Sequence, residues 1–414
     1  MSKMKICDFI DKVGDGIHGT PKYDDEGTYF FINGNNLVNG KIEITNETLK
    51  ISDLEYERIK RPINNNTLLL SINGTLGKIA VYNGEKVALG KSVCFINVKE
   101  QVNKYFIKYI LSTKEFQKYI QLVSHGSTIK NLSPSQVADY EFNCCNYEYQ
   151  DKIAFLLKSL DEKIDNNNKI NEELESMAKT IYDYWFLQFE FPNEEGKPYK
   201  SSGGKMVWNE ELKREIPEGW GKGYLRDILN LHTDTISKKQ IKKTDLYTPI
   251  DCLPKKKMCF YDEALIEEAQ SSLIKYRKRD ILLGAMRVYF HRVCIAPSDG
   301  ITRTTTFVLR PKHDKNLGFS YQTINRNDSI DYATKNSIGT QQPYAVWENN
   351  LEDFYFAMPP LELMIKYSER VENSIKLIIK NTKEIKELTS LRDFILPLLM
   401  NGQVGFRELA LVED

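Results

Sequence analysis

The sequence carries an internal repeat with a spacing of about 213 residues, and this repeat restricts the possible folds more than any other feature. Three segments of the first half return in the same order in the second half: 67–72 (TLLLSI), 77–81 (GKIAV) and 92–96 (SVCFI) correspond to 280–285 (DILLGA), 291–295 (HRVCI) and 304–308 (TTTFV). Further along, 126–128 and 139–142 correspond to 339–341 and 353–356. Because each copy is long enough to bury a core of its own, we expect two similar domains.

Each half opens with residues typical of short strands and tight turns. Both openings are rich in Gly, Asn, Thr, Val, Ile, Tyr and Phe, and Asn-Gly pairs at Asn33, Asn39, Asn73 and Asn83 are signals of chain reversal. The pattern predicts mixed domains with a β-rich core and a few helices, such as one over 102–121. The predicted fold class is α+β.

Each half ends in a helix of coiled-coil character, because seam residues recur at alternate spacings of four and three. The first seam is Ile153, Leu157, Leu160, Ile164, Asn167, Asn171, Leu174, Ala178, Ile181 and Trp185, and the second is Leu361, Met364, Ser368, Val371, Ile375, Ile378, Thr382, Ile385, Leu388, Leu391 and Ile395. Each seam needs a partner, so we expect the two helices to pair antiparallel within one molecule. Pro397 is expected to end the second helix.

Two polar residues, Asn167 and Asn171, stand at the centre of the first seam. A buried Asn in a coiled coil can fix the register of the two helices. The alternative is a hydrated or frayed middle where the helices diverge.

These patterns divide the chain into five parts. Residues 1–150 and 221–358 are the two β-rich domains, 151–190 and 359–404 are the central and C-terminal spacer helices, and 191–220 is a linker. The stretch 191–204 is rich in Pro, Gly and Ser and is expected to carry no core.

Charge and composition exclude several classes of protein. The formal net charge is zero, yet residues 221–312 hold 18 Lys and Arg against 10 Asp and Glu, whereas 151–190 hold 5 against 9. Such segregation suggests a local basic surface, although ordinary variation between solvated faces is the alternative. No stretch is apolar enough to span a bilayer, and the seven cysteines form no CxxC pair, so we expect a cytoplasmic protein with reduced thiols.

Enzyme motifs were sought because catalysis needs a constellation of residues. Gly90, Lys91 and Ser92 resemble the end of a phosphate-binding P-loop, but the required first glycine is replaced by Glu85. HExxH and GxSxG are absent, Met358 stands where a methyltransferase motif needs Asn, and the five histidines are scattered. We therefore expect neither catalysis nor a metal site.

Amide and basic side chains in the predicted loops suggest recognition of base edges in DNA, since Asn and Gln pair with adenine and Arg and Lys with guanine. In the first half the candidates are His18, Thr20, Lys22, Asn33, Asn35, Asn36, Ser71, Asn73, Thr75, Lys78, Lys91, Ser92, Ser127, Thr128, Lys130 and Asn131. In the second half they are Lys238, Lys239, Lys242, Lys243, Lys255, Lys256, Lys257, Arg287, Tyr289, His291, Arg292, Arg303, Thr304, Gln341 and Gln342. For each of them, a turn residue or a solvated lysine is the alternative.

Several of these segments resemble the specificity subunits of type I restriction-modification enzymes. The opening of a target recognition domain in that family is similar to 14–23 (GDGIHGTPKY) with 31–37 (FINGNNL), and its later blocks are similar to 68–79 (LLLSINGTLGKI) and 126–132 (GSTIKNL). The phrase that opens a second recognition domain is similar to 215–220 (EIPEGW), preceded by 204–208 (GKMVW), and 247–254 (YTPIDCLP) resembles one recognition-domain subtype. The resemblance runs from about Phe9 to Val404.

The resemblance implies that the two domains are target recognition domains, each reading one half of a bipartite site in double-stranded DNA. The helices would hold them apart and dock two methyltransferase (modification) subunits, through which restriction and translocase subunits join. S-adenosylmethionine, ATP and magnesium would belong to those partners and none to this chain. The second domain lacks the HGTP opening and has 339–344 (GTQQPY) in place of GSTIKN, so the two half-sites are expected to differ.

The sequence leaves two other functions open. The chain would be a structural adaptor if its helices organised partners without any reading of DNA. It would be the recognition part of a single-chain restriction enzyme if a catalytic domain were fused to it, but no residues remain for a methyltransferase domain of roughly 200 residues.

Overall fold

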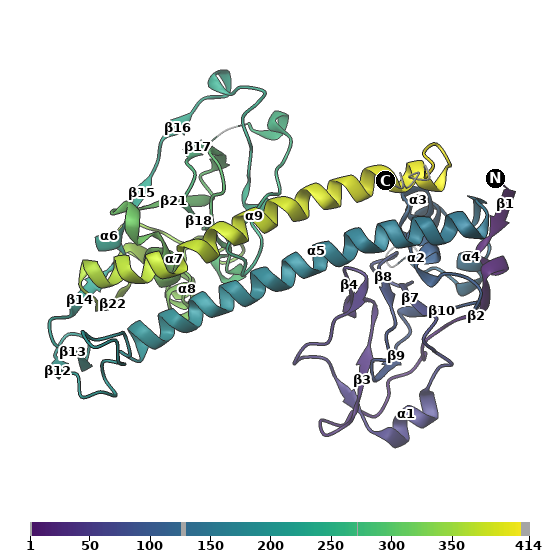
Figure 1. The fold of residues 1–414 in the computed structure, drawn as a ribbon, viewed down its shortest axis with the longest axis horizontal. Coiled ribbons are helices and arrows are strands. Elements are labelled where there is room, and N and C mark those ends of the chain that lie inside the picture. Colours follow the sequence, from purple (N-terminus) through teal and green to yellow (C-terminus); the bar gives the residue numbers. More distant parts are fainter. Residues whose placement is uncertain (1, 126–129, 271, 407–414) are drawn as a thin grey trace, which may run out of the picture. The chain divides into compact units, whose positions relative to one another are not determined.

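A computed structural model describes residues 2–125, 130–270 and 272–406, and it shows helices and sheets in an α+β fold, as the sequence predicts (Figure 1). The chain divides into two compact units. Unit 1 comprises Met1–Glu162 and Thr389–Asp414, and unit 2 comprises Lys163–Leu388. Two long helices, α5 (Tyr147–Tyr182) and α9 (Leu361–Met400), contribute residues to both units.

Unit 1 is built mainly from short strands. Its strands are β1 (Ser2–Lys5), β2 (Ile10–Asp15), β3 (Tyr29–Ile32), β4 (Leu37–Val38), β5 (Lys41–Ile42), β6 (Lys50–Ile51), β7 (Thr67–Ser71), β8 (Ile79–Val81), β9 (Val87–Leu89), β10 (Val93–Val98) and β11 (Glu141–Cys144). Its short helices are α1 (Asp53–Ile59), α2 (Lys104–Ser112), α3 (Lys114–Val123) and α4 (Pro134–Ala138), with 3-10 turns at Ile6–Phe9 and Gly34–Asn36.

Unit 2 is likewise built mainly from short strands. Its strands are β12 (Met206–Asn209), β13 (Arg214–Pro217), β14 (Gly221–Tyr224), β15 (Leu229–His232), β16 (Thr235–Ile236), β17 (Leu273–Tyr276), β18 (Ile281–Gly284), β19 (Val293–Ile295), β20 (Gly300–Arg303), β21 (Thr306–Pro311) and β22 (Tyr355–Met358). Its short helices are α6 (Leu225–Ile228), α7 (Leu317–Ile324) and α8 (Asn327–Lys335). Single 3-10 turns cover Lys238–Gln240, Ile250–Cys252, Ile266–Glu268, Val288–Phe290, Asp314–Asn316 and Leu351–Asp353, and a π-helical turn, Asp183–Leu187, follows α5.

The central sheets of the two units have the same topology. The order is β2-β10-β7-β8 in unit 1 and β15-β21-β18-β19 in unit 2, and all the pairs are antiparallel. The paired segments are those that the sequence repeat brings into correspondence, so the repeat is confirmed. All residues of β7 and β18 are buried, which explains their nearly continuous apolar sequences.

In unit 1 the two long helices cover one core together. Ile153 and Leu157 of α5 and Leu396, Leu399 and Met400 of α9 are buried with the sheet and with α2 and α3. Where the helices meet, Asp161 accepts hydrogen bonds from Arg392 (2.9 Å) and from the Tyr109 hydroxyl (2.7 Å), and it also pairs with Lys108.

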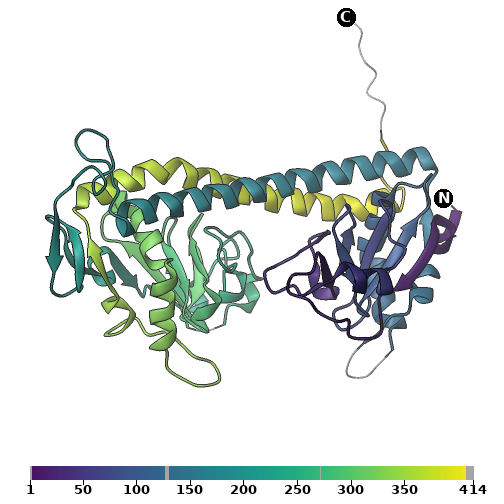
Figure 2. The ribbon, with the colours of Figure 1, turned by 90° about the horizontal axis from the view of Figure 1, so that it is seen from below.

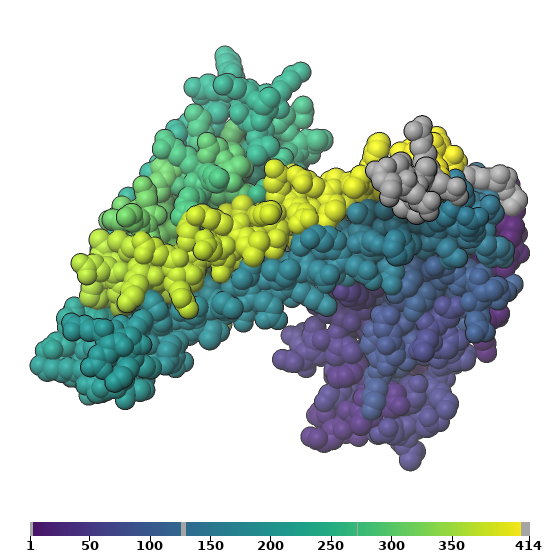
Figure 3. Space-filling model, viewed as in Figure 1, coloured from purple at the N-terminus to yellow at the C-terminus, as the bar shows by residue number. Residues whose placement is uncertain are grey.

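In unit 2 the helices run antiparallel through polar contacts as well as apolar ones. Asn171, which is 6 % exposed, donates to the Thr382 hydroxyl (3.2 Å) and accepts from Asn381 (3.0 Å). Asn167 donates to Glu384 (2.9 Å), and the Tyr367 hydroxyl donates to the Ala178 carbonyl (2.8 Å). Figures 1 and 2 show the helices side by side within this unit, and in Figure 3 their side chains are in contact on the visible face.

Four expectations about local structure are corrected. The single helix predicted over 102–121 is two helices, because Thr113 ends α2 and its hydroxyl caps α3 by accepting from the Phe116 amide (3.2 Å). Pro397 does not end α9, which continues to Met400 because its last residues are buried in the core of unit 1.

The stretch 191–204 contributes to the core of unit 2, whereas its Pro, Gly and Ser content predicts that it carries no core. The ring of Phe191 stacks on Tyr199 and on Trp220, with centroids 4.5 Å and 5.3 Å apart, and Trp220 is buried in the core of unit 2. Asn33 begins a 3-10 turn instead of a hairpin. By contrast, Asn39 and Gly40 join β4 to β5 with positive φ angles of 49° and 82°, as a tight hairpin turn requires.

Within the described ranges, no helix has both the length and the apolar character needed to cross a bilayer. The seven cysteines are free thiols, as expected, and burial raises the pKa of Cys259 to about 12.

Replacing Asp161 with Asn tests how much unit 1 depends on the junction of its helices. Burial alone would raise the pKa of Asp161, but the charge of Lys108 and the hydrogen bonds from Lys108, Arg392 and Tyr109 lower it below its usual value. The stabilisation is therefore present above the unfolded pKa of about 3.9 and is lost as the pH falls through the lowered folded value. Asp161→Asn should reduce the free energy of unfolding at pH 7 by about 2–4 kcal/mol.

Chemical denaturation of the full chain measures this loss, and the difference from wild type should disappear at low pH. Glu162→Gln is the matched control, because Glu162 forms only an exposed ion pair with Lys158 (3.3 Å) and should cost less than about 1 kcal/mol. Equal losses of unfolding free energy in the two variants would show that Asp161 stabilises unit 1 no more than an exposed ion pair does.

Candidate nucleic-acid interface

The loops of unit 1 that carry the predicted residues meet at one end of its central sheet. The Gly34 amide donates to the Ser92 hydroxyl (2.9 Å), and that hydroxyl donates to the Asn33 side chain (3.1 Å). The Ile72 amide donates to the Ser92 carbonyl (2.9 Å). The ends of β3 and β7 are thereby fastened to the start of β10.

The opening loop of unit 1 joins the same cluster. The Gly16 amide donates to the Val93 carbonyl and the Ile17 amide to the Leu89 carbonyl, both at 2.9 Å. His18, one side chain of this loop, lies 2.6 Å from the Asp15 carboxylate through its Nε2 atom. The segments 14–23, 31–37 and 68–79 of unit 1, which carry part of the family resemblance, are thus neighbours in space.

The β7–β8 connection and the segment of Lys130 and Asn131 complete this cluster. Asn73 and Asn131 form an antiparallel bridge, and the Gly74 amide donates to the Lys130 carbonyl (3.2 Å). Lys130 in turn donates to the Gln121 side chain (2.8 Å). Ser127 and Thr128, which the sequence also predicts as contacts, lie outside the described residues.

The predicted residues of unit 1 differ in exposure. Exposed are His18, Thr20, Lys22, Asn33, Asn35, Thr75, Lys91, Lys130 and Asn131, whereas Asn36, Asn73, Lys78 and Ser92 are partly buried. Ser71 is fully buried, and its hydroxyl accepts from the Lys78 amide (2.8 Å), so it shapes the loop from inside the protein. Asn36 likewise turns inward, since its side chain donates to the Glu43 carbonyl (3.0 Å).

Unit 2 gathers a corresponding set at the β18–β19 connection. The Arg287 amide donates to the Pro343 carbonyl (2.7 Å), which brings the loop of Gln341 and Gln342 alongside. The Tyr344 hydroxyl donates to the Thr304 carbonyl (2.7 Å), next to Arg303. The loop that carries Gln341 projects from the side of unit 2 opposite the helices, following α8 in Figure 2.

Lysines 255–257 lie against this connection but are not equivalent. The Lys256 amide donates to the His291 carbonyl (2.8 Å), and the Lys255 ammonium lies 3.9 Å from the ring centroid of Phe290. Lys257 instead forms an ion pair with Glu172 of α5 (2.7 Å). Its charge is therefore already matched within the protein.

Two further predicted residues of unit 2 are held by internal hydrogen bonds. His291 is buried, and its Nε2 atom lies 2.9 Å from the Asn325 amide oxygen. Arg292 donates to the Leu253 carbonyl (2.8 Å) and to the Ile250 carbonyl. His291, Arg292 and Ser71 therefore face the interior of the protein and not the surface that could meet DNA.

Four further predicted basic residues of unit 2 are exposed lysines after β16: Lys238, Lys239, Lys242 and Lys243. β16 pairs with β17, and β17 pairs with β20, which ends at Arg303. The four lysines therefore follow a strand of the sheet that contains Arg303, and they add positive charge to unit 2. Tyr289, Arg303, Thr304, Gln341 and Gln342 are exposed as well.

Sequence patterns did not identify Arg61 as part of the cluster in unit 1. Its guanidinium donates to the Gly16 carbonyl (3.0 Å), and its buried Nε atom has no hydrogen-bond partner among the described residues. Because Arg61 lies 45 positions from Gly16, only the folded chain brings them together.

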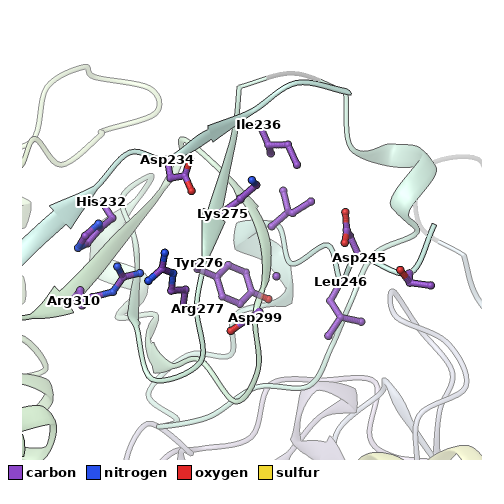
Figure 4. A pocket seen from close by; sticks show the side chains of 13 residues that line it. His232, Asp234, Ile236, Asp245, Leu246, Lys275, Tyr276, Arg277, Asp299 and Arg310 are labelled. Carbon is purple, nitrogen blue, oxygen red and sulfur yellow. The ribbon is translucent and has the colours of Figure 1, made fainter. Parts of the chain in front are cut away.

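A pocket of about 670 Å³ lies in unit 2 among strands β15, β16, β17, β20 and β21. In Figure 4, His232 and Arg310 line one end of it and Asp245 and Leu246 the other. Its charged side chains are Asp234, Asp245, Asp299, Lys275, Arg277 and Arg310, and Arg310 is bound to Asp280 through two hydrogen bonds (2.7 and 2.8 Å). With carboxylates and cations mixed, the pocket does not offer a phosphate a surface of one sign.

Neither a dinucleotide-binding loop nor a metal-binding cluster is formed by the described residues. Residues 14–19 (GDGIHG) match the G-x-G-x-x-G spacing of dinucleotide-binding loops, but the described residues after β2 form no helix that would receive a pyrophosphate. In the part of the chain that the structure describes, no group of three or more His, Cys, Asp or Glu side chains is placed to hold a metal ion.

The fold and the loop clusters define an α+β protein with two topologically equivalent units, each with amide and cationic loops at the end of its central sheet. Comparisons with known proteins agree with the resemblance seen in the sequence. Residues 1–176 match the family described as the type I restriction modification DNA specificity domain. The resemblance to type I specificity subunits that the sequence shows is thereby confirmed.

Whole-chain similarities agree with this match. The chain is 26 % identical over 366 residues to the specificity subunit of the type I restriction enzyme MjaIX from Methanocaldococcus jannaschii, covering 83 % of this chain and 78 % of the relative. It is 19 % identical over 442 residues to the HindI specificity subunit from Haemophilus influenzae, covering 90 % and 94 %. The crystal structure of a type I S subunit from M. genitalium has the same fold, with a TM-score of 0.59, 17 % identity and coverage of 96 % and 95 %.

A pair of glycine substitutions tests whether the opening loop must lie against the sheet. A Cβ atom on Gly16 would lie 2.3 Å from the carbonyl oxygens of Leu89 and Gly90, so the backbone would have to shift. Gly16→Ala should lower the free energy of unfolding by about 1–3 kcal/mol. Gly19→Ala is the matched control, because a Cβ there meets nothing within 4 Å. Chemical denaturation of both variants checks this, and equal stabilities would show that the loop tolerates displacement.

Proposed function

We propose that this chain is the sequence-specific DNA-recognition subunit of a type I restriction-modification complex, in which each unit reads one half of a bipartite target. The observation that carries the proposal is the equivalence of the two units. Both have the same central sheet topology, and in both the connections at one end of that sheet carry exposed amide and basic side chains. Amide and cationic groups are those that read base edges in the major groove.

The two loop sets differ in chemistry, which supports a target with two different halves. Unit 1 presents chiefly amides, hydroxyls and single lysines, such as Asn33, Asn35 and Lys91. Unit 2 presents a group of lysines together with Gln341 and Gln342. Because the donor and acceptor groups differ, the same base sequence would not satisfy both surfaces.

The helices α5 and α9 would form an intramolecular antiparallel coiled coil that separates the recognition domains and docks two methyltransferase subunits. The contacts of Asn171 with Asn381 and Thr382 support a fixed register for this pair. Phe155 of α5 and Phe394 of α9 are 75 % and 67 % exposed, which supports a further partner on the helices.

In this function the chain itself carries out no chemistry. Methyl transfer, DNA translocation and cleavage would belong to the methyltransferase and restriction subunits, with their S-adenosylmethionine, ATP and magnesium. Methylome sequencing of cells with and without the gene, in the presence of the methyltransferase, tests the proposal directly. A bipartite methylation pattern that depends on this chain is expected, and an unchanged methylome would favour the adaptor function.

Substitutions in unit 2 should separate contacts to phosphate from contacts to bases. Replacing Lys238, Lys239, Lys242 and Lys243 with Ala should weaken binding to all sequences alike, and the slope of log affinity against log salt should flatten by about 0.9 for each lysine that touches phosphate. Gln341→Ala should cost about 1–3 kcal/mol on the cognate duplex only. Asn35→Ala in unit 1 should relax the other half-site. Titrations of the assembled methyltransferase with duplexes that carry single-base changes measure these effects. Equal losses of affinity on cognate and unrelated DNA would show that the amides form turns and do not contact bases.

Shortening both helices by one heptad tests whether they set the spacing of the target. Asn171 contacts Asn381 and Asp161 contacts Arg392, so residues 162–168 of α5 lie opposite 384–390 of α9. Removing both segments keeps the heptad pattern and the facing residues matched. The non-specific spacer between the half-sites should become shorter, with both half-sites unchanged. Methylome sequencing measures the spacer, and an unaltered length would show that the helices are not the ruler.

A further inference from the structure

The connection between β18 and β19 holds two residues in a strained backbone conformation. Arg287 and His291 have φ angles of 50° and 53°, in the left-handed region that side chains with a Cβ disfavour. They flank the 3-10 turn of Val288, Tyr289 and Phe290.

Unit 1 makes the equivalent connection without this strain. Between β7 and β8 the positive φ angles belong to Gly74 (73°) and Gly77 (85°), which adopt them at little cost. Gly74 and Arg287 lie 213 positions apart, at corresponding points of the repeat. Unit 2 therefore keeps a side chain where glycine would be the easier residue, and strain of this kind gathers at functional sites.

Internal contacts fix the strained loop at both ends. His291 is 7 % exposed, and its Nε2 atom lies 3.0 Å from the Asn325 carbonyl and 2.9 Å from the Asn325 side-chain oxygen. At the other end, the Arg287 amide donates to the Pro343 carbonyl (2.7 Å). The turn between these two residues is therefore held by hydrogen bonds at both ends.

This turn displays one aromatic ring. Tyr289 is 48 % exposed, and its ring packs edge-on against Phe290, with centroids 5.0 Å apart and an angle of 63°. The Lys255 ammonium lies 3.9 Å from the centroid of Phe290. The exposed ring of Tyr289 therefore packs against a second ring, Phe290. Phe290 in turn contacts the Lys255 ammonium, a cation that would attract the DNA backbone.

We propose that Tyr289 is a wedge that stacks on a base at a step of the half-site read by unit 2. The inference rests on the proposed DNA-reading function and assigns it a residue that acts through DNA deformation instead of hydrogen bonding. An apolar or aromatic side chain inserted between base pairs unstacks them and bends the duplex, and its cost depends on the sequence of the step. Tyr289 would thereby add specificity at a position where no donor or acceptor reads the base.

Three variants of the full chain, assembled with the methyltransferase, test the wedge on the cognate duplex. Tyr289→Ala should weaken cognate binding about tenfold or more, as expected for the loss of one stacking contact. Tyr289→Phe should bind within about twofold of wild type, because the ring remains. Tyr355→Ala is the control, since Tyr355 is also exposed (50 %) in unit 2 but lies on β22. It should bind as wild type does.

A fluorescent base reports the wedge itself. With 2-aminopurine placed in turn at each step of this half-site, wild type and Tyr289→Phe should change the emission at one step, and Tyr289→Ala should not. Full binding by Tyr289→Ala would overturn the proposal, and so would a loss in Tyr289→Phe equal to that in Tyr289→Ala, which would indicate a hydrogen bond from the hydroxyl. If the wild-type complex binds no specific duplex, the proposed function fails first and the wedge with it.

Discussion

Neither unit of this protein completes its core without both long helices. Unit 1 buries Ile153 and Leu157 from α5 together with Leu396 from α9, and unit 2 buries Tyr182 from α5 together with Tyr367 from α9. Apolar packing alone would allow the helices to slide past each other. The polar contacts of Asp161 with Arg392 and of Asn171 with Asn381 remove that freedom, because each would leave a buried group unpaired after a shift.

Much of the architecture was predictable from the sequence because periodicity and repeats report directly on burial. The matched strands of the two units and the two long helices are of this kind. The missed features depend on tertiary contacts that no local pattern records. Helix α9 passes through Pro397 because the core of unit 1 holds its last turn, and Leu391, a predicted seam residue, is 46 % exposed while its neighbour Arg392 turns toward Asp161. Trp220 gives the Pro-rich stretch a partner for Phe191.

The predicted residues of each unit lie together as sets of loops, but single residues within a set differ in whether they face outward. In unit 1, segments that resemble the family meet at one end of a sheet, yet composition does not distinguish an outward amide from an inward hydroxyl. Ser71 and Lys78 belong to the same predicted loop, but the Ser71 hydroxyl accepts from the backbone of that loop and is buried. Arg61 was missed for the converse reason, since its relation to Gly16 exists only in the folded chain.

The position of Leu396, Leu399 and Met400 in the core of unit 1 has a consequence for synthesis on the ribosome. Domains generally fold as they emerge, from the N-terminus onward. Here the domain that emerges first must wait for residues that are translated after the whole of unit 2. Until then its apolar face beside Ile153 and Leu157 stays open to solvent and to chaperones. A nascent chain interrupted within α9 would therefore carry an unfinished first domain, although every loop of its sheet had already been made.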